Sequence, residues 1–143
     1  MNQVPPLVDT VHLEEPEQLL KEIAMMKELT PCTRDYLVSF GECMSTRIFA
    51  AYLNRVSVKA RQYDAFDIGF ITTYDFSNAD ISEATYPAVA KRLHGDWISD
   101  PAIPIVTGFL GKGWRSCAIT TLGQGGSDLT ATTIGKAFGL EEI

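Results

Sequence analysis

The sequence predicts an α/β protein, with helices packed on a mostly parallel sheet. Short runs rich in β-branched residues alternate along the chain with longer runs of helical periodicity. Glycines gather where strand-like runs end, at residues 108–113 and 123–126. Hydrophobic residues make up 45% and charged residues 21% of the 143 positions, which is typical of a globular domain. Together these observations favour an α/β sandwich over an all-helical or all-β fold.

The helical pattern occurs in four segments. Residues 1–13 contain Pro5 and Pro6, and we expect this segment to be irregular. The rest of the chain, residues 14–143, is expected to form one domain. Apolar residues recur at helical spacing in residues 14–29, 34–54, 82–93 and 127–138. Gly95 and Gly139 are expected to end the last two of these helices.

The helix predicted at residues 34–54 has two distinct faces. An apolar stripe is expected to face the core and consists of Leu37, Phe40, Met44, Ile48 and Ala51. A polar set lies on another face and consists of Ser39, Glu42, Ser45 and Thr46. Glu42 is the only acid between Asp35 and Asp64. Two interpretations of it stay open: a solvated acid on an outer face, or a functional carboxylate.

Four segments are expected to be strands: residues 58–63, 68–73, 103–107 and 118–122. The third is an apolar run that closes in glycines, as a buried parallel strand does where it opens into a loop. Residues 112–117 are expected to form a basic turn. In open parallel sheets, ligands bind outside the carboxyl ends of the strands. Both glycine-rich segments are expected at that edge.

The glycine-rich segment at residues 123–126 is followed by Ser127 and Asp128, which are good helix N-cap residues. A helix start with a flexible glycine backbone offers free N–H groups to an anion. The alternative is a turn that needs glycine for its geometry alone. The spacing matches neither a phosphate-binding P-loop nor the dinucleotide-binding glycine fingerprint.

Composition excludes several classes of function. The 12 basic and 18 acidic residues give a net charge of −6, which disfavours nucleic acid as a partner. The longest apolar runs are too short to span a membrane. Cys32, Cys43 and Cys117 are far apart, so we expect reduced thiols, no disulfide framework and no metal site.

Three ordered motifs resemble the aspartate kinases of the amino-acid kinase family. They are Ser-Phe-Gly-Glu-Cys-Met-Ser-Thr at residues 39–46, Val-Thr-Gly-Phe-Leu-Gly at 106–111, and Thr-Leu-Gly-Gln-Gly-Gly-Ser-Asp-Leu-Thr-Ala at 121–131. Residues 60–66 and 84–97 resemble the plant-type, lysine-sensitive, single-function enzymes. The resemblance implies a three-layer α/β/α sandwich that is incomplete at both ends, that is, an internal piece of the catalytic domain.

The resemblance also implies a reaction, the phosphorylation of L-aspartate to 4-phospho-L-aspartate by ATP with Mg²⁺. This is the first step toward lysine, threonine, methionine and isoleucine. Glu42 would meet the ammonium group of aspartate. Gly125, Gly126 and Ser127 would cradle the substrate and the transferred phosphoryl group, and Asp128 would be an organising catalytic acid. A homodimer and a plastid location are implied in the same way.

The sequence departs from the family pattern at two points. The family's Lys-Phe-Gly-Gly-Ser/Thr motif, whose lysine contacts phosphates, does not occur among the 143 residues. Gln124 stands where the family's glycine loop normally has arginine, so a neutral amide replaces a group that pairs with the substrate carboxylate. Two hypotheses follow: a piece of an aspartate kinase that holds the aspartate-binding residues, or a truncated, inactive paralogue with at most a structural or dimerisation role.

Overall fold

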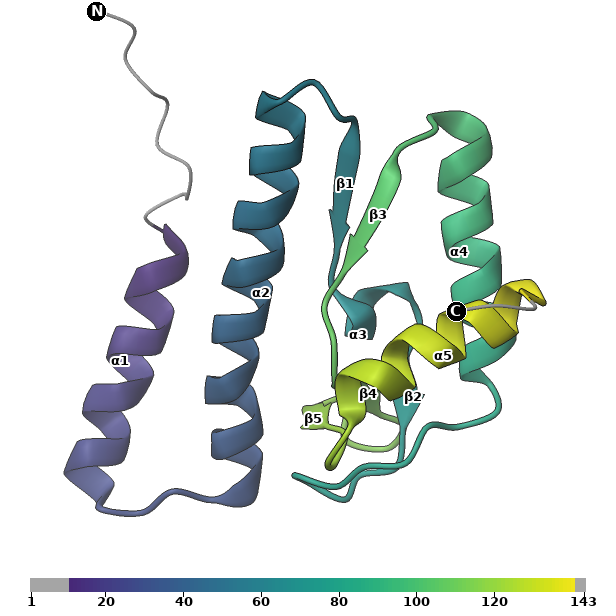
Figure 1. Cartoon of the computed structure of the whole chain (residues 1–143). Coiled ribbons are helices and arrows are strands. Elements are labelled where there is room, and N and C mark those ends of the chain that lie inside the picture. The colour runs from purple at the N-terminus through teal and green to yellow at the C-terminus, as the bar shows by residue number, and fades with distance from the viewer. Residues whose placement is uncertain (1–10, 141–143) are drawn as a thin grey trace, which may run out of the picture.

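A computed structural model describes residues 11–140 as alternating helices and strands (Figure 1). In chain order these are α1 (Val11–Met26), α2 (Pro31–Arg55), β1 (Ala60–Tyr63), α3 (Ala65–Ile68), β2 (Ile71–Thr72), α4 (Thr85–Ser99), β3 (Ile103–Val106), β4 (Leu110–Gly113), β5 (Ile119–Thr121) and α5 (Gly126–Phe138). The first ten residues, most of the segment expected to be irregular, lie outside the described part. Helix α1 begins at Val11, inside that segment.

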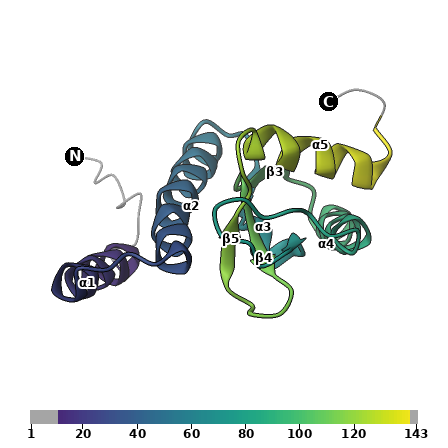
Figure 2. The same ribbon diagram turned by 90° about the horizontal axis from the view of Figure 1, so that it is seen from below.

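The strands form two small sheets. β1 pairs in parallel with β3, from Ala60 opposite Ile103 to Tyr63 opposite Val106. In the second sheet β2 is parallel to β4, and β4 is antiparallel to β5. Helix α2 lies on one side of the strands, and α4 and α5 lie on the other (Figures 1 and 2). The predicted α/β fold with mostly parallel strand pairing is therefore confirmed.

The apolar core lies on the α4 side of the strands. It is a cluster of buried residues from β1, α3, α4 and the segments between them: Tyr63, Ala65, Ile68, Phe70, Val89 and Leu93. Phe70 is fully buried. The short helix α3 was not predicted, because four residues are too few to show helical periodicity. It ends at Gly69, whose φ of +107° is readily available only to glycine.

The buried face of α2 is the polar one, so the predicted core face was wrong. The buried residues are Asp35, Ser39, Cys43, Thr46 and Ala50. Ile48, assigned to the core from its spacing, is 46% exposed. Small and hydroxyl-bearing side chains allow α2 to approach β1 and β5 closely. There Thr46 accepts a hydrogen bond from Gln62 of β1, and Asp35 accepts one from Thr121 of β5.

Two further predicted boundaries were wrong. Gly95 does not end α4, which continues to Ser99, where the Ser99 hydroxyl donates to the Gly95 carbonyl at 2.9 Å. A glycine inside a helix costs only about 1 kcal/mol, which the surrounding contacts offset. Part of the first glycine-rich segment is β4 rather than loop. Gly111 is needed there, because a Cβ would lie 2.3 Å from Cγ2 of Thr72.

Helix α1 packs against α2 as an antiparallel hairpin at one side of the molecule (Figure 1). The Tyr36 hydroxyl donates a hydrogen bond to the Glu15 carboxylate across this hairpin. This bond, with burial and the negative charge of Glu15, raises the pKa of Tyr36 to about 12. Among residues 11–140, no helix has the length and apolar content needed to cross a bilayer.

Candidate functional site

The glycine loop after β5 leads directly into helix α5. Gly125 is the N-cap of that helix, with a φ of +76°, so neither Ser127 nor Asp128 has the capping position expected for them. Gly126 is packed so closely that a Cβ would lie 2.7 Å from Cβ of Phe109. One glycine thus supplies the left-handed backbone and the next supplies the close approach.

Glu42 reaches from the middle of α2 to the end of β3. Its Oε1 accepts a hydrogen bond from the backbone N–H of Gly108 at 2.7 Å. Among residues 11–140, its Oε2 has only a long contact with the Ser45 hydroxyl, at 3.5 Å. One carboxylate oxygen is therefore fixed by the protein, and the other keeps acceptor capacity for a ligand.

Gly108 is the point at which Glu42 and the glycine loop meet. A Cβ built on Gly108 would lie 2.8 Å from the Ser127 hydroxyl and 3.4 Å from Oε1 of Glu42. All three residues line one groove of about 450 Å³, together with residues of β3 and α5. The absence of a side chain at position 108 is thus what leaves room between a carboxylate and a helix N-terminus.

The two glycine-rich segments are held together by Thr130. Its hydroxyl accepts from the Phe109 N–H at 3.0 Å and donates to the Gly126 carbonyl at 2.8 Å. The Leu122 N–H also donates to the Phe109 carbonyl at 2.8 Å. Since Thr130 is buried, both bonds are shielded from water. The loop after β3 and the start of α5 therefore form one hydrogen-bonded unit.

The structure brings together only some of the residues singled out from the sequence. Glu42 and Ser127 line the groove, and Gly125 and Gly126 form the backbone beside it. Gln124 and Asp128 are exposed and do not line the groove. Within residues 11–140 the side chain of neither one makes a hydrogen bond.

Two further residues of this region were not predicted to have a role from the sequence. Asp35, at the start of α2, is 1% exposed and accepts four hydrogen bonds from residues 77 and 121. The sequence analysis assigned no role to Asp35. Thr130 lies in the motif at residues 121–131, but no role was assigned to it either. Both act by contacts between segments far apart in the chain, which periodicity does not reveal.

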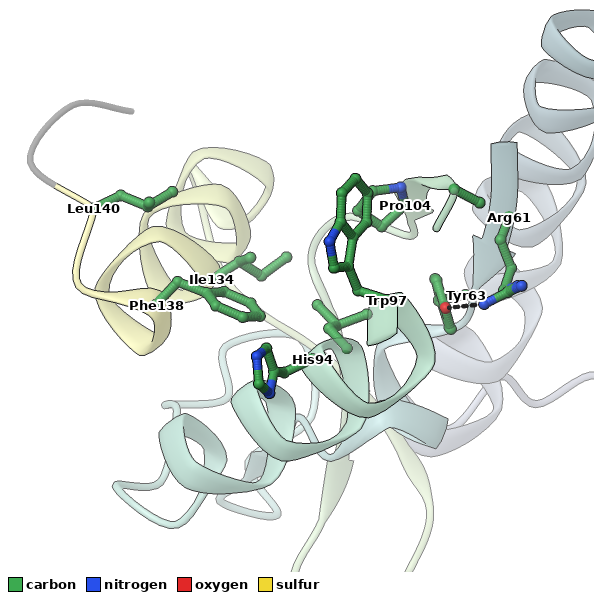
Figure 3. A pocket seen from close by; sticks show the side chains of 10 residues that line it. Arg61, Tyr63, His94, Trp97, Pro104, Ile134, Phe138 and Leu140 are labelled. Carbon is green, nitrogen blue, oxygen red and sulfur yellow. Dashed lines mark hydrogen bonds between the residues drawn. The ribbon is translucent and has the colours of Figure 1, made fainter. Parts of the chain in front are cut away.

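A second hollow of about 520 Å³ lies between β3, α4 and α5 (Figure 3). Its walls are mostly apolar, with Trp97 and Phe138 on facing helices, and Arg61 and Tyr63 contribute from β1. The lining residues include no carboxylate. A zwitterionic amino acid therefore fits the Glu42 groove better than this hollow.

Among residues 11–140, no three His, Cys, Asp or Glu side chains come together as a metal-binding group. Asp128 is an isolated acid in the first turn of α5. Mg²⁺ usually keeps its waters and binds one or two carboxylates together with substrate phosphates. We assign no residue of this chain to the metal or to a nucleotide.

The family model for the amino acid kinase family matches residues 8–143. The chain belongs to the amino acid kinase family. Within it, the chain is similar to the aspartokinases. It is 77% identical to aspartokinase 1, chloroplastic, of Arabidopsis thaliana, over 98% of this chain and 25% of that protein. It is 35% identical to the aspartokinase of Mycolicibacterium smegmatis over 76% of this chain and 24% of that protein.

A solved structure shows the same fold relationship. The structure of E. coli aspartokinase III in complex with aspartate and ADP superimposes with a TM-score of 0.71 at 30% identity, covering 93% of this chain and 30% of that one. The recognition made from the three sequence motifs is therefore confirmed. The chain spans about a quarter of the length of the curated relatives it matches.

Proposed function

We propose that this chain carries the aspartate-binding part of an aspartate kinase, which phosphorylates L-aspartate to 4-phospho-L-aspartate at the expense of ATP. The observation that carries the proposal is the groove at Gly108, where the Glu42 carboxylate and the Ser127 hydroxyl approach the same glycine. High identity to plant aspartokinases and the aspartate in the E. coli structure support the same assignment.

Glu42 would bind the ammonium group of the substrate. The Gly108 N–H orients its carboxylate, so the side chain loses little conformational freedom on binding. The long Ser45 contact leaves Oε2 ready to accept a hydrogen bond from the ammonium. A charge-assisted bond of this kind is about twice as strong as a neutral one.

The start of α5 would receive the negative end of the substrate. The N–H of Gly126 already donates to the Gly123 carbonyl at 3.0 Å, so Gly126 would cradle the substrate through its lack of a side chain. Gly125 and Ser127 would present backbone N–H groups at the N-terminus of α5, where the helix dipole favours anions. They would hold a carboxylate of aspartate and the transferred phosphoryl group. Positioning and charge neutralisation are what phosphoryl transfer mainly requires of a protein.

Asp128 and Gln124 have different roles in this proposal. Asp128, one residue beyond Ser127, would organise the cationic groups that stabilise the transferred phosphoryl. Gln124 would contact the substrate carboxylate through its amide. ATP supplies the phosphoryl group, and Mg²⁺ would accompany it. A homodimer and the plastid, where the Arabidopsis relatives are named as chloroplastic, complete the proposal.

The proposal is tested by titrating the 143-residue chain with L-aspartate and following backbone amides by ¹H–¹⁵N NMR. We expect the amide signals of Gly108, Gly125 and Gly126 to shift together. Glu42→Gln keeps the shape of the side chain but removes its charge, and should weaken binding about tenfold or more. Glu83→Gln, on a different part of the surface, is the control and should bind as the unmodified chain does.

A uniform lack of shifts at the groove, or equal affinity of Glu42→Gln and Glu83→Gln, would refute the aspartate site. Catalysis is a separate measurement. Because the family's phosphate-contacting lysine motif does not occur in the sequence, we expect no aspartate-dependent ATP turnover from the 143 residues alone. Trapping β-aspartyl phosphate with hydroxylamine, above the level of a Glu42→Ala control, would overturn that expectation.

A further inference from the structure

Asp35 is a buried residue whose carboxylate accepts four hydrogen bonds. Its Oδ2 accepts from the backbone N–H groups of Ser77 and Thr121, each at 2.8 Å. Its Oδ1 accepts from the hydroxyls of the same two residues, each at 3.0 Å. A carboxylate has about four lone-pair sites, and here four donors occupy them. No salt bridge among the described residues involves Asp35.

The four bonds connect three segments that are distant in the sequence. Asp35 lies in the first two turns of α2, Ser77 lies in the loop after β2, and Thr121 is the last residue of β5. The glycine loop begins two residues after Thr121. The neighbouring loop is close as well, since a Cβ on Gly123 would lie 2.2 Å from Oδ1 of Asn78. Asp35 therefore fixes both the beginning of the glycine loop and the loop that packs on it.

The same helix carries Glu42. Asp35 and Glu42 are seven residues apart, about two helical turns or 10 Å along the axis, and both contact elements on the strand side of α2. A helix is a rigid connection over this length. The distance between the Glu42 carboxylate and the glycine loop is thus set at two points of α2, by Gly108 at one and by Thr121 at the other.

We propose that Asp35 is a positioning residue of the aspartate site: it aligns the glycine loop with Glu42 without touching substrate. This inference rests on the proposed function, because the site that it aligns is the proposed aspartate site. Asp35 is 1% exposed and all of its acceptor sites are occupied, so direct contact with a ligand is excluded. Small displacements at such a site cost much in binding and rate.

Two substitutions separate alignment from charge. Asp35→Ala removes all four acceptor contacts and leaves buried donors unpaired. Asp35→Asn loses the charge but keeps the shape: its oxygen can accept from the two backbone N–H groups, and its NH₂ can donate to the two hydroxyls, which rotate to become acceptors. Alignment predicts that Asn restores most of what Ala loses. A purely electrostatic role predicts that both variants fail equally.

The experiment measures two quantities on the 143-residue chain: the dissociation constant for L-aspartate and amide hydrogen exchange. For Asp35→Ala we expect an affinity for L-aspartate about tenfold weaker than that of the unmodified chain. The amide exchange rates of residues 125–127 should rise about tenfold more than that of the reference residue Gln62 in β1. For Asp35→Asn we expect both quantities within about threefold of the unmodified chain. Thr85→Val is the stability control, since it removes a buried hydroxyl of α4 whose hydrogen bonds are to the backbone of Ile71 and not to Asp35 or the glycine loop.

A folded Asp35→Ala variant with unchanged affinity and unchanged local exchange would overturn the inference. So would equal weakening of aspartate binding in Thr85→Val, which would mean that general destabilisation is the cause. If Asp35→Ala does not fold, Ser77→Ala removes one of the four bonds and should give about a two- to threefold effect in the same direction. If the unmodified chain gives no response to aspartate, the proposed function fails, but the exchange comparison still tests the role of Asp35.

Discussion

The two faces of the strand layer are covered by different kinds of contact. On the α4 side, aliphatic and aromatic residues form the core around Phe70. On the α2 side, the buried helix face carries Asp35, Ser39 and Thr46, and hydrogen bonds connect it to the rest of the molecule. Apolar burial is strong but has no direction, whereas hydrogen bonds have both direction and length. The groove with Glu42 lies where directed contacts prevail.

The two kinds of contact can separate the stability of the chain from the precision of its site. The α4 side should determine how stable the chain is, and the α2 side should determine where Glu42 and the glycine loop stand. Substitutions on the first side are expected to change the free energy of unfolding and leave aspartate affinity alone. Substitutions on the second side are expected to change affinity. Five predictions test this account, from the largest expected effect to the smallest.

The largest effect is expected for Phe70→Ala in the apolar core. Phe70 is fully buried, and loss of its ring should lower the free energy of unfolding by about 3–5 kcal/mol, measured by urea denaturation. The affinity of the folded fraction for L-aspartate should stay within about twofold of the unmodified value, as expected for independent sites. A folded variant that binds aspartate far more weakly would break the proposed division.

Gln124→Arg is expected to strengthen aspartate binding. Gln124 is exposed beside the groove, so an arginine can extend from it without a steric clash. A bidentate bond to the substrate carboxylate should contribute about 1.5–3 kcal/mol, one to two powers of ten in the dissociation constant measured by calorimetry. Gln124→Lys lacks the planar fork and should gain less. Equal affinity of all three chains would refute a carboxylate contact at position 124.

Gly126→Ala should disturb the glycine loop through its packing. The added Cβ would lie 2.7 Å from Cβ of Phe109 and 2.9 Å from Cβ of Leu122, so the loop has to move. We expect a loss of about 1–3 kcal/mol in stability, together with weaker aspartate binding. Gly41→Ala is the matched control, because a Cβ there meets nothing within 4 Å and should stabilise helix α2 by about 0.5–1 kcal/mol.

The smallest effect at neutral pH concerns Cys43, on the buried face of α2. Burial, and then the negative charge of Asp64, raise the pKa of this thiol from 9.0 to about 12. In the folded chain it should stay protonated and react with iodoacetamide far more slowly than the exposed Cys117. Mass spectrometry of the alkylated peptides checks this order, and equal rates for the two thiols would contradict it.

The same shift predicts a dependence of stability on pH. Below pH 9 the Cys43 thiol is protonated in both the folded and the unfolded chain, so its titration does not lower the free energy of unfolding. Between pH 9 and about 12 the thiol ionises only in the unfolded chain, which favours unfolding, so stability falls as the pH rises. Urea denaturation at about pH 8 and about pH 11 should therefore show a larger loss of stability in the unmodified chain than in Cys43→Ala.

Much of the fold could be predicted from the sequence because it depends on local patterns. The apolar run of β3 and the periodic segment of α5, with Gly139 after it, are local features, and both are present in the structure. The length of α4 was mispredicted, because Gly95 is a stop only when the following residues do not continue the helix. Trp97 and Ile98 follow Gly95 and continue α4, and neither residue type signals whether a helix goes on or stops.

The candidate site was only partly predictable, for a different reason. Spacing identified the two faces of α2 but could not determine which one is buried, since a buried polar face needs partners that spacing does not show. Asp35 finds those partners at residues 77 and 121. Spacing singled out Glu42 and Ser127, and the resemblance implied their roles, whereas the hydrogen bond of Glu42 to Gly108 depends on three-dimensional geometry alone.

The most direct test of the central claim compares two ligands that differ only in the ammonium group. L-aspartate and succinate both carry two carboxylates, but succinate has no ammonium. If Glu42 binds that group, the chain should prefer L-aspartate over succinate by about tenfold or more, and Glu42→Gln should abolish most of this preference. A preference that persists in Glu42→Gln would contradict the assignment of Glu42 as the residue that binds the ammonium of aspartate.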